Sequence, residues 1–239
     1  IHKSNESDLV TLIYTSGTTG VPKGVMLSNK NLLSNIYGVS RIQKDIGNED
    51  FLSFLPLSHI LERMAGHFYP MFCNSRIYYA ENMETVAANM AEISPTVVVS
   101  VPRFFEKMYN AVVKGVREGS PIKQKLFWWA IQVGKDYVAI NNSEYNTPFL
   151  LKLKHKLADK LVYGKIKAKI GGKIKFFISG GAPLSSDVAE FFASLNVTIL
   201  EGYGLTETSP VLTSNTPGTV KFGYVGKPLE NVEIKLASD

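Results

Sequence analysis

The sequence predicts an α/β protein with a doubly wound, mainly parallel sheet, flanking helices and the start of a small β subdomain at its C-terminal end. Runs of β-forming residues alternate with helical patterns, which is typical of parallel sheets. Three predicted strands end in loops rich in Gly, Ser and Thr, at 15–24, 179–185 and 201–209. The 239 residues, 45% hydrophobic and 20% charged, have the composition of a globular protein with a sizeable core.

Short apolar runs bounded by Gly, Pro or polar residues indicate the strands. They lie at 9–14, 51–55, 76–79, 96–100, 174–178 and 198–200. The run LVTLIY at 9–14 is expected to be a buried strand that enters the first loop.

Helical periodicity separates these strands. Ser28 is placed to cap a helix with an apolar face up to Val39, and Pro102 opens a helix with apolar positions up to Val116. Further helices are expected at about 59–72, 84–92, 121–140, 148–163 and 186–195. Short strands without helices follow Thr219, so we expect an α/β region at 1–219 and the start of a second subdomain at 220–239.

Charge and cysteine content exclude several classes of protein. The net charge is +5, but segment 150–175 holds nine lysines against one acid, Asp159, so the basic excess is local and does not indicate nucleic-acid binding. Cys73 is the single cysteine, which excludes an intrachain disulfide and favours a cytoplasmic compartment. The histidines lack the HExxH spacing of zinc enzymes. No apolar run of ~18 residues and no signal-peptide pattern is present, so we expect no transmembrane helix.

The first loop, TSGTTGVPKG at 15–24, has the chemistry of a phosphate cradle. Its glycines let backbone N–H groups approach an anion, its hydroxyl side chains add donors, and Lys23 adds a cation. It is not a GxxxxGK[ST] loop, because Pro22 precedes Lys23 and Gly24 follows it. For a Gly/Thr-rich segment taken alone, the alternative is an ordinary surface turn.

Two further motifs follow this loop along the chain, SGGAPL at 179–184 and EGYGLTET at 201–208. The three together resemble the phosphate-binding, adenine-contacting and magnesium-holding motifs of the adenylate-forming (AMP-binding) superfamily. The segments SFLPLSHILER at 53–63 and VPRFFEKM at 101–108 make the chain most similar to long-chain fatty-acid CoA ligases. The resemblance covers essentially the whole chain, and it implies a central fragment of the large N-terminal domain without the mobile C-terminal domain.

The resemblance implies a two-step ligase reaction. A fatty-acid carboxylate attacks the α-phosphate of ATP, with Mg²⁺ present, giving acyl-adenylate and pyrophosphate. Coenzyme A then takes the acyl group and AMP leaves. The alternatives are adenylation of a fatty acid for transfer to a carrier protein, and a non-catalytic nucleotide-binding module. The fragment alone is expected to bind ATP or AMP weakly with little turnover, because the family's catalytic lysine belongs to the absent domain.

The resemblance also implies roles for single residues. Contacts to ATP are assigned to Thr15, Ser16, Gly17, Thr18, Thr19, Gly20, Lys23, Gly181, Ala182, Pro183, Glu201, Gly202, Tyr203, Gly204 and Thr206. The expected catalytic residues are Lys23, Thr206, which offers its hydroxyl to the α-phosphate, and Glu207, which holds Mg²⁺. His59 and Gly180 are assigned to the acyl substrate. Outside such motifs, a Tyr or Glu is typical of core packing or an ion pair, and His59 would be a helix residue that contacts only the backbone.

The lysine-rich segment 150–175 has two interpretations. Its helix carries four lysines beside leucines at 150, 153, 157 and 161, which is typical of a solvated helix face. The alternative is attraction to an anionic membrane surface, which would make the protein peripheral to a membrane. Glu62 and Arg63 likewise form either an intrahelical pair or part of a functional site.

Overall fold

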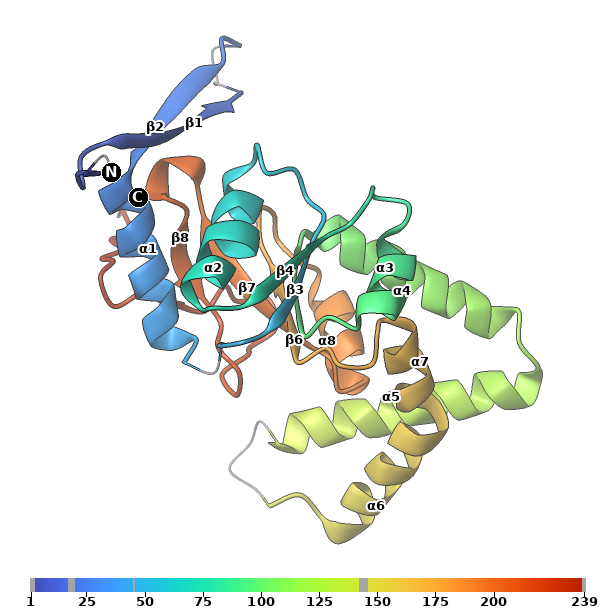
Figure 1. Ribbon diagram of the computed structural model, residues 1–239. Coiled ribbons are helices and arrows are strands. Elements are labelled where there is room, and N and C mark those ends of the chain that lie inside the picture. The colour runs from blue at the N-terminus through green and yellow to red at the C-terminus, as the bar shows by residue number, and fades with distance from the viewer. Residues whose placement is uncertain (1–2, 17–19, 45, 142–145, 238–239) are drawn as a thin grey trace.

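A seven-stranded sheet forms the centre of the protein. The computed structural model describes all residues except 1–2, 17–19, 45, 142–145 and 238–239 (Figure 1). The strand order is β4-β3-β5-β6-β7-β8-β9. Strands β3 to β7 run parallel to their neighbours, and β8 and β9 are added antiparallel. The strands are β3 (Asp50–Ser53), β4 (Arg76–Tyr79), β5 (Val97–Ser100), β6 (Phe176–Ser179), β7 (Thr198–Gly204), β8 (Val211–Ser214) and β9 (Lys227–Pro228).

Helices cover both faces of this sheet, which confirms the predicted α/β class with a mostly parallel sheet (Figure 1). Two segments, η1 and η2, are π-helical, and η3 is a 3₁₀ turn. The helical segments are α1 (Asn29–Ile42), η1 (Glu62–Phe68), α2 (Tyr69–Phe72), α3 (Val86–Ile93), α4 (Pro102–Arg117), α5 (Pro121–Asn141), α6 (Phe149–Ala158), η2 (Asp159–Tyr163), α7 (Gly164–Lys169), α8 (Ser186–Ser194) and η3 (Thr206–Thr208).

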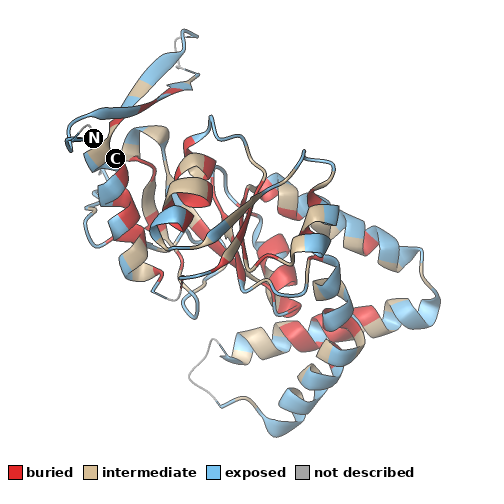
Figure 2. Ribbon diagram, viewed as in Figure 1, coloured by how far each residue is buried: buried red, intermediate tan, exposed pale blue. Residues whose placement is uncertain are grey.

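Alternate residues of each strand point into two separate cores, one on each face of the sheet. On one face Phe105 of α4 meets Phe177 of β6 and Phe192 of α8 edge to face, with ring centroids 5.5 and 6.0 Å apart. On the other face Val99 of β5 and Leu200 of β7 pack with residues of α1 and η1. Buried residues accordingly follow the sheet and the inward helix faces (Figure 2).

Local signals fix where two helices begin. The hydroxyl of Ser28 accepts a 3.3 Å hydrogen bond from the backbone N–H of Asn31, and the Asn31 side chain accepts a 2.9 Å bond from the N–H of Ser28. This reciprocal pair satisfies two donors at the start of α1. Pro102 is the first residue of α4, where a backbone N–H would have no partner within the helix. Both helices begin where the sequence predicted.

The strand predicted at 9–14 forms, but it does not join the central sheet. Strand β1 (Leu9–Thr15) pairs antiparallel with β2 (Lys23–Ser28), which the sequence reading did not predict. The two form a separate hairpin that projects from the body of the molecule (Figure 1). Leu9 and Leu12 are exposed and Tyr14 is 72% exposed. Thr11 and Ile13 are buried, so the strand is buried along one face only, and the prediction of a buried strand was wrong for the other face.

The C-terminal part of the sheet also departs from the prediction. Strand β7 continues to Gly204, so residues 201–204 belong to a strand rather than to a loop. The chain then turns and returns as β8, which pairs with β7. Strand β9 pairs with β8, and the neighbouring Leu229 is buried in the core beside α1. The proposed subdomain boundary between 219 and 220 remains a prediction.

Candidate functional site

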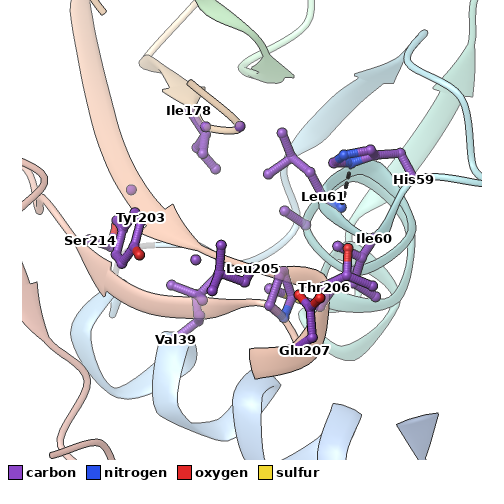
Figure 3. A pocket seen from close by; sticks show the side chains of 18 of the residues that line it. Val39, His59, Ile60, Leu61, Ile178, Tyr203, Leu205, Thr206, Glu207 and Ser214 are labelled. Atoms are coloured by element: carbon purple, nitrogen blue, oxygen red, sulfur yellow. Dashed lines mark hydrogen bonds between the residues drawn. The ribbon is translucent and has the colours of Figure 1, made fainter. Parts of the chain in front are cut away.

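A cavity of about 440 Å³ opens at the carboxyl ends of β6 and β7 (Figure 3). This is the edge at which open α/β sheets bind their ligands. Its walls come from the tip of the β1–β2 hairpin, the end of α1, the helical turns around η1 and the turn after β7. The volume lies within the ~300–1,000 Å³ of typical small-molecule sites.

The hairpin contributes hydroxyl groups and one cation to the polar part of this wall. Thr15, Ser16 and Lys23 line the cavity, and the strand register places Thr15 directly opposite Lys23. The Lys23 side chain is exposed and makes no ion pair among the residues that the structure describes. Its ammonium group is therefore available to an anion in the cavity.

The segment after β6 and the end of β7 supply backbone groups. Gly180 and Gly181 line the cavity directly after β6, and Gly202, Tyr203 and Gly204 line it from the end of β7. A ligand can approach the main chain closely here, because four of these five residues have no side chain.

A tight turn presents Thr206 and Glu207 to the cavity. The hydroxyl of Thr208 accepts a 2.9 Å hydrogen bond from the N–H of Leu205 and lies 2.5 Å from the carbonyl oxygen of Pro210, to which it donates. The same carbonyl lies so close to Gly204 that a Cβ atom there would be 2.0 Å from it. Only glycine fits at this position, and the turn is fixed at both ends.

Asn35 of α1 holds the other side of this turn. Its side-chain NH₂ donates a 2.7 Å hydrogen bond to the carbonyl of Val211, and its side-chain oxygen accepts a 3.1 Å bond from the N–H of the same residue. The amide thus pairs with β8 as a neighbouring strand would. Asn35 is buried, so these two bonds fix Pro210 and Val211 of the cavity wall relative to α1.

His59 stands at the start of the helical segment that leads into η1. Its Nδ1 accepts a 3.2 Å hydrogen bond from the backbone N–H of Leu61, which caps the helix (Figure 3). This bond selects the neutral tautomer with the proton on Nε2, which remains a donor. His59 contacts the backbone and also lines the cavity, and its assignment to the acyl substrate remains a prediction.

The remaining wall of the cavity is apolar. Apart from Leu205 and Pro210, which lie in the segment 203–210 that the family resemblance makes a candidate for the wall of the acyl site, these residues were not identified as a site from the sequence. They come mainly from α1, the helical segment after His59 and the strands, and they include Val39, Ile60, Leu61, Met64, Ala65, Tyr69, Ile178, Leu205, Pro210 and Val211. Several repeat at helical spacing, which is equally typical of core packing. The one available signal was that Ile60 to Ala65 directly follow the LSH sequence at 57–59.

The cavity brings together most, but not all, of the residues assigned from the family resemblance. Those that line it are Thr15, Ser16, Lys23, His59, Gly180, Gly181, Gly202, Tyr203, Gly204, Thr206 and Glu207. Gly20, Ala182, Pro183 and Glu201 do not line it, and the first three are exposed. Gly17, Thr18 and Thr19 lie outside the described residues. The individual roles remain predictions.

Two buried carboxyl groups lie next to the cavity without lining it. Glu201 is buried in β7, and burial raises its pKa against the lowering effect of a hydrogen bond from the backbone of Leu184. Glu62 has no exposed surface, and its carboxyl accepts a hydrogen bond from Ser53. Burial raises the pKa of Glu62 from 4.5 to about 7, although that hydrogen bond and the backbone of Phe54 and Leu55 lower it. Both side chains therefore favour the protonated form more than exposed carboxyl groups do.

Glu62 and Arg63 do not form an intrahelical pair. Arg63 donates a 2.7 Å hydrogen bond from Nε to the carbonyl of Leu57 and a second bond from Nη1 to the hydroxyl of Thr11. It therefore ties β1 to the helical segment beside the cavity, whereas Glu62 points toward Ser53 at the end of β3.

The chemistry of Glu207 fits a magnesium ion that is shared with a phosphate ligand. Its carboxylate is exposed and has no hydrogen bond or ion pair to any described residue. No cluster of three or more His, Cys, Asp or Glu side chains in the described part of the chain could hold a metal by itself. Mg²⁺ is typically bound by one or two carboxylates together with substrate phosphates, which matches this arrangement.

Comparison with known proteins gives consistent results. A family model described as AMP-binding enzyme matches residues 1–239. Long chain acyl-CoA synthetase 6, peroxisomal, of Arabidopsis thaliana is 36% identical over 232 residues, which are 96% of this chain and 31% of that protein. Long-chain-fatty-acid–CoA ligase FadD15 of Mycobacterium bovis is 37% identical over 235 residues, 98% of this chain and 38% of that protein. The chain thus spans about a third of the length of these relatives.

Solved structures show the same fold. ATP-bound MatB from Rhodopseudomonas palustris aligns with a TM-score of 0.59 and 26% identity, covering 94% of this chain and 35% of that one. O-succinylbenzoate coenzyme A synthetase (MenE) from Bacillus subtilis, in complex with ATP and magnesium ion, aligns with a TM-score of 0.65 over 99% of this chain and 39% of that one. Its identity of 20% supports the likeness of fold alone.

Proposed function

Because this chain belongs to the family of AMP-binding enzymes, we propose that it carries the nucleotide and acyl site of a long-chain fatty-acid–CoA ligase. In the first step a fatty-acid carboxylate attacks the α-phosphate of ATP, the bond to the β-phosphate breaks, and pyrophosphate leaves. In the second step the thiol of coenzyme A attacks the acyl-adenylate, and AMP leaves with the bonding electrons. The names of the relatives at 36% and 37% identity support both the long acyl chain and coenzyme A.

One observation carries this proposal, the two-part wall of a single cavity. Its polar lining comprises Lys23, the hydroxyl groups of Thr15 and Ser16, glycine backbone and the Thr206–Glu207 turn, whereas its apolar lining includes the buried side chains of Ile60, Met64 and Ala65. A fatty acid joined to adenosine monophosphate has the same two halves. Binding it requires donors and cations beside the phosphate and a dry surface for the chain.

The polar residues of the cavity would lower the activation barrier of the first step by stabilising negative charge. Both reactants are anionic, so the site needs positive charge and oriented donors before they can approach. Lys23, Thr15 and Ser16 would hold the β- and γ-phosphates, and Thr206 would donate to the α-phosphate. Mg²⁺, held by Glu207, would neutralise charge on the phosphates. Loss of one such donor typically raises a barrier by roughly 3 kcal/mol.

His59 and Tyr203 would position the two organic groups. The Nε2–H of His59 is left as a donor by the Leu61 hydrogen bond, and it is suited to a carboxylate at the cavity mouth. Tyr203 is half-exposed at the end of β7, where its ring offers a face on which adenine can stack.

Fatty-acid-dependent exchange of pyrophosphate into ATP tests the proposal. A protein with the length of the relatives should catalyse this exchange with long-chain acids, and it should form a thioester with coenzyme A rather than with a carrier-protein thiol. This 239-residue chain should bind ATP or AMP with little turnover. Exchange that does not depend on a fatty acid, or thioester formed only on a carrier protein, would contradict the assignment.

A further inference from the structure

Helix α6 is anchored to the protein along one face. Ala158 is fully buried, and Leu151 packs against the core that contains α5 and α8. The ring of His155 stacks on Tyr137 of α5 with a centroid distance of 3.9 Å and an interplanar angle of 21°. These contacts fix the rotation of α6 about its own axis, so its opposite face points away from the protein (Figures 1 and 2).

The outward face of α6 is apolar along its centre. Phe149, Leu150, Leu153 and Leu157 are 81%, 60%, 55% and 48% exposed. At about 100° per residue, the three leucines lie within one narrow stripe of the helix surface. Only the fourth leucine of the predicted stripe, Leu161, packs against the core. Such a continuous exposed apolar stripe is uncommon on a protein surface that meets only water.

Lysines border this stripe on both sides. Lys152 and Lys156 lie on one side by helical spacing, Lys154 lies on the other, and Lys160 follows in η2. All four are exposed, and none forms an ion pair within the part of the chain that the structure describes. Asp159, the acid nearest in sequence, is bonded to Lys167 at 2.6 Å. No described acidic residue therefore pairs with the positive charge on this side of α6.

We infer that this lysine–leucine face (Phe149, Leu150, Leu153 and Leu157 with Lys152, Lys154, Lys156 and Lys160) docks on the surface of an anionic lipid bilayer. Apolar side chains flanked by lysines match a bilayer, which presents negative head groups above an apolar interior. A protein partner would need acidic groups on both borders of an apolar groove. Among the described residues, no helix is long and apolar enough to cross a membrane, so α6 would lie in the plane of the interface.

The docking face lies apart from the cavity. None of the residues that line the cavity comes from α5 or α6. Helix α6 would therefore not cover the cavity when it contacts a membrane. The inference rests on α6 alone and does not depend on the proposed ligase reaction.

Co-sedimentation of this chain with lipid vesicles tests the inference. Binding should be strong on vesicles that contain phosphatidylserine, weak on pure phosphatidylcholine, and reduced by added salt. Each lysine near an anionic surface strengthens binding roughly fivefold. Changing Lys152, Lys154, Lys156 and Lys160 together to Gln should therefore weaken binding by roughly a hundredfold or more. Changing Leu150, Leu153 and Leu157 to Asn should weaken it at least about tenfold.

A matched control separates this face from general charge. A second quadruple variant changes Lys44, Lys107, Lys227 and Lys235 to Gln; these lysines are exposed and lie outside α6. It carries the same net charge as the α6 lysine variant and should bind anionic vesicles much more tightly than that variant. Circular dichroism and thermal unfolding of each variant check that the fold is kept.

Three results would overturn the inference. The first is equal binding to neutral and anionic vesicles. The second is equal loss in the two lysine variants, which would indicate a diffuse charge effect. The third is that the unchanged chain does not bind vesicles or that the leucine substitutions have no effect. Either outcome is expected if a protein segment covers this face instead.

Discussion

The carboxyl group of Glu62 accepts a 2.5 Å hydrogen bond from the hydroxyl of Ser53, and this bond joins η1 to the end of β3. Both residues are buried. The second carboxyl oxygen of Glu62 is buried and has no hydrogen-bond partner among the described residues. A titratable carboxyl group therefore lies in the contact that holds η1 against the end of β3, next to the cavity.

The first prediction concerns the pH dependence of stability. Burial raises the pKa of Glu62 from 4.5 to about 7. Between these values the folded chain retains a proton that the unfolded chain has released, so the free energy of unfolding falls as the pH rises. The stabilisation is complete below about pH 4.5 and is lost by the time the pH passes 7; the whole difference is roughly 3 kcal/mol.

Urea unfolding at a series of pH values checks this prediction. Glu62→Gln should remove the part of the slope between pH 4.5 and 7, because an amide cannot titrate. Glu92→Gln, which changes an exposed residue of α3, serves as the control and should keep the slope. An identical slope in the Glu62 variant would show that this carboxyl does not titrate in that range.

The second prediction uses the contact between Glu62 and Gly66. A Cβ atom at Gly66 would lie 2.6 Å from the Glu62 carboxyl carbon, which Ser53 holds in place. Gly66→Ala should therefore destabilise the protein by about 1–3 kcal/mol through overpacking. Gly115→Ala in α4 is the matched control, since no atom lies within 4 Å of its added Cβ. It should be neutral or stabilising by up to about 1 kcal/mol. Equal effects in thermal unfolding would contradict the contact.

The third prediction concerns the two hydrogen bonds between Asn35 and Val211. Asn35→Ala removes the side-chain partner of the half-buried carbonyl and N–H of Val211, which should cost about 1–2 kcal/mol. Asn35→Ala should also weaken nucleotide binding, because Asn35 holds Val211, and the turn that carries Thr206 and Glu207 leads directly into Val211. Asn110→Ala changes an exposed residue of α4 and should alter neither property. Calorimetric titration with AMP and thermal unfolding measure both effects, and unchanged values for Asn35→Ala would refute the role.

The fourth prediction separates the phosphates that two residues hold. Lys23→Ala should weaken ATP binding about 10- to 100-fold, in line with a lost charge-assisted hydrogen bond, and should leave AMP binding nearly unchanged. Thr206→Val should weaken the binding of both nucleotides, because both contain the α-phosphate. Lys44→Ala, which removes an exposed lysine outside the cavity, is the charge control. Equal losses for ATP and AMP in Lys23→Ala would argue against its assignment to the β- and γ-phosphates.

The fifth prediction concerns the apolar lining of the cavity. Ala65 lines the cavity and is buried, so Ala65→Phe would fill the space proposed for the acyl chain. ATP–pyrophosphate exchange by the longer protein should then fall with long-chain acids and persist with short ones. Ala88→Phe, on the exposed side of α3, adds the same side chain away from the cavity and should leave the chain-length profile unchanged. A uniform loss at all chain lengths would indicate general damage instead.

The alternation of strands and helices was predictable because each element has its own local pattern. Val97, Val98 and Val99 form a continuous apolar run, as a strand buried on both faces requires. The failure at 9–14 has an equally physical cause. A run of β-forming residues indicates a strand, but it does not indicate which strand will be its partner, and β1 pairs with β2, the next strand along the chain.

The polar half of the candidate site was predictable from motifs, and the apolar half was not. The motif at 201–208 placed Thr206 and Glu207 in one loop, and the turn after β7 does bring both to the cavity. Met64 and Ala65 carry no local mark that separates a cavity wall from ordinary core. Asn35 was missed because its role depends on a partner 176 residues further along the chain.

That same distance has a consequence for biosynthesis. Asn35 is synthesised long before Val211, and domains fold as their parts emerge from the ribosome. Until Val211 is synthesised, the side-chain amide of Asn35 in α1 has no partner on β8, and one wall of the cavity is missing. A nascent chain stalled short of Val211 should therefore be unable to capture nucleotide, however well its earlier helices have formed. Because such distant pairings also slow folding, the cavity should be among the last parts of the protein to form.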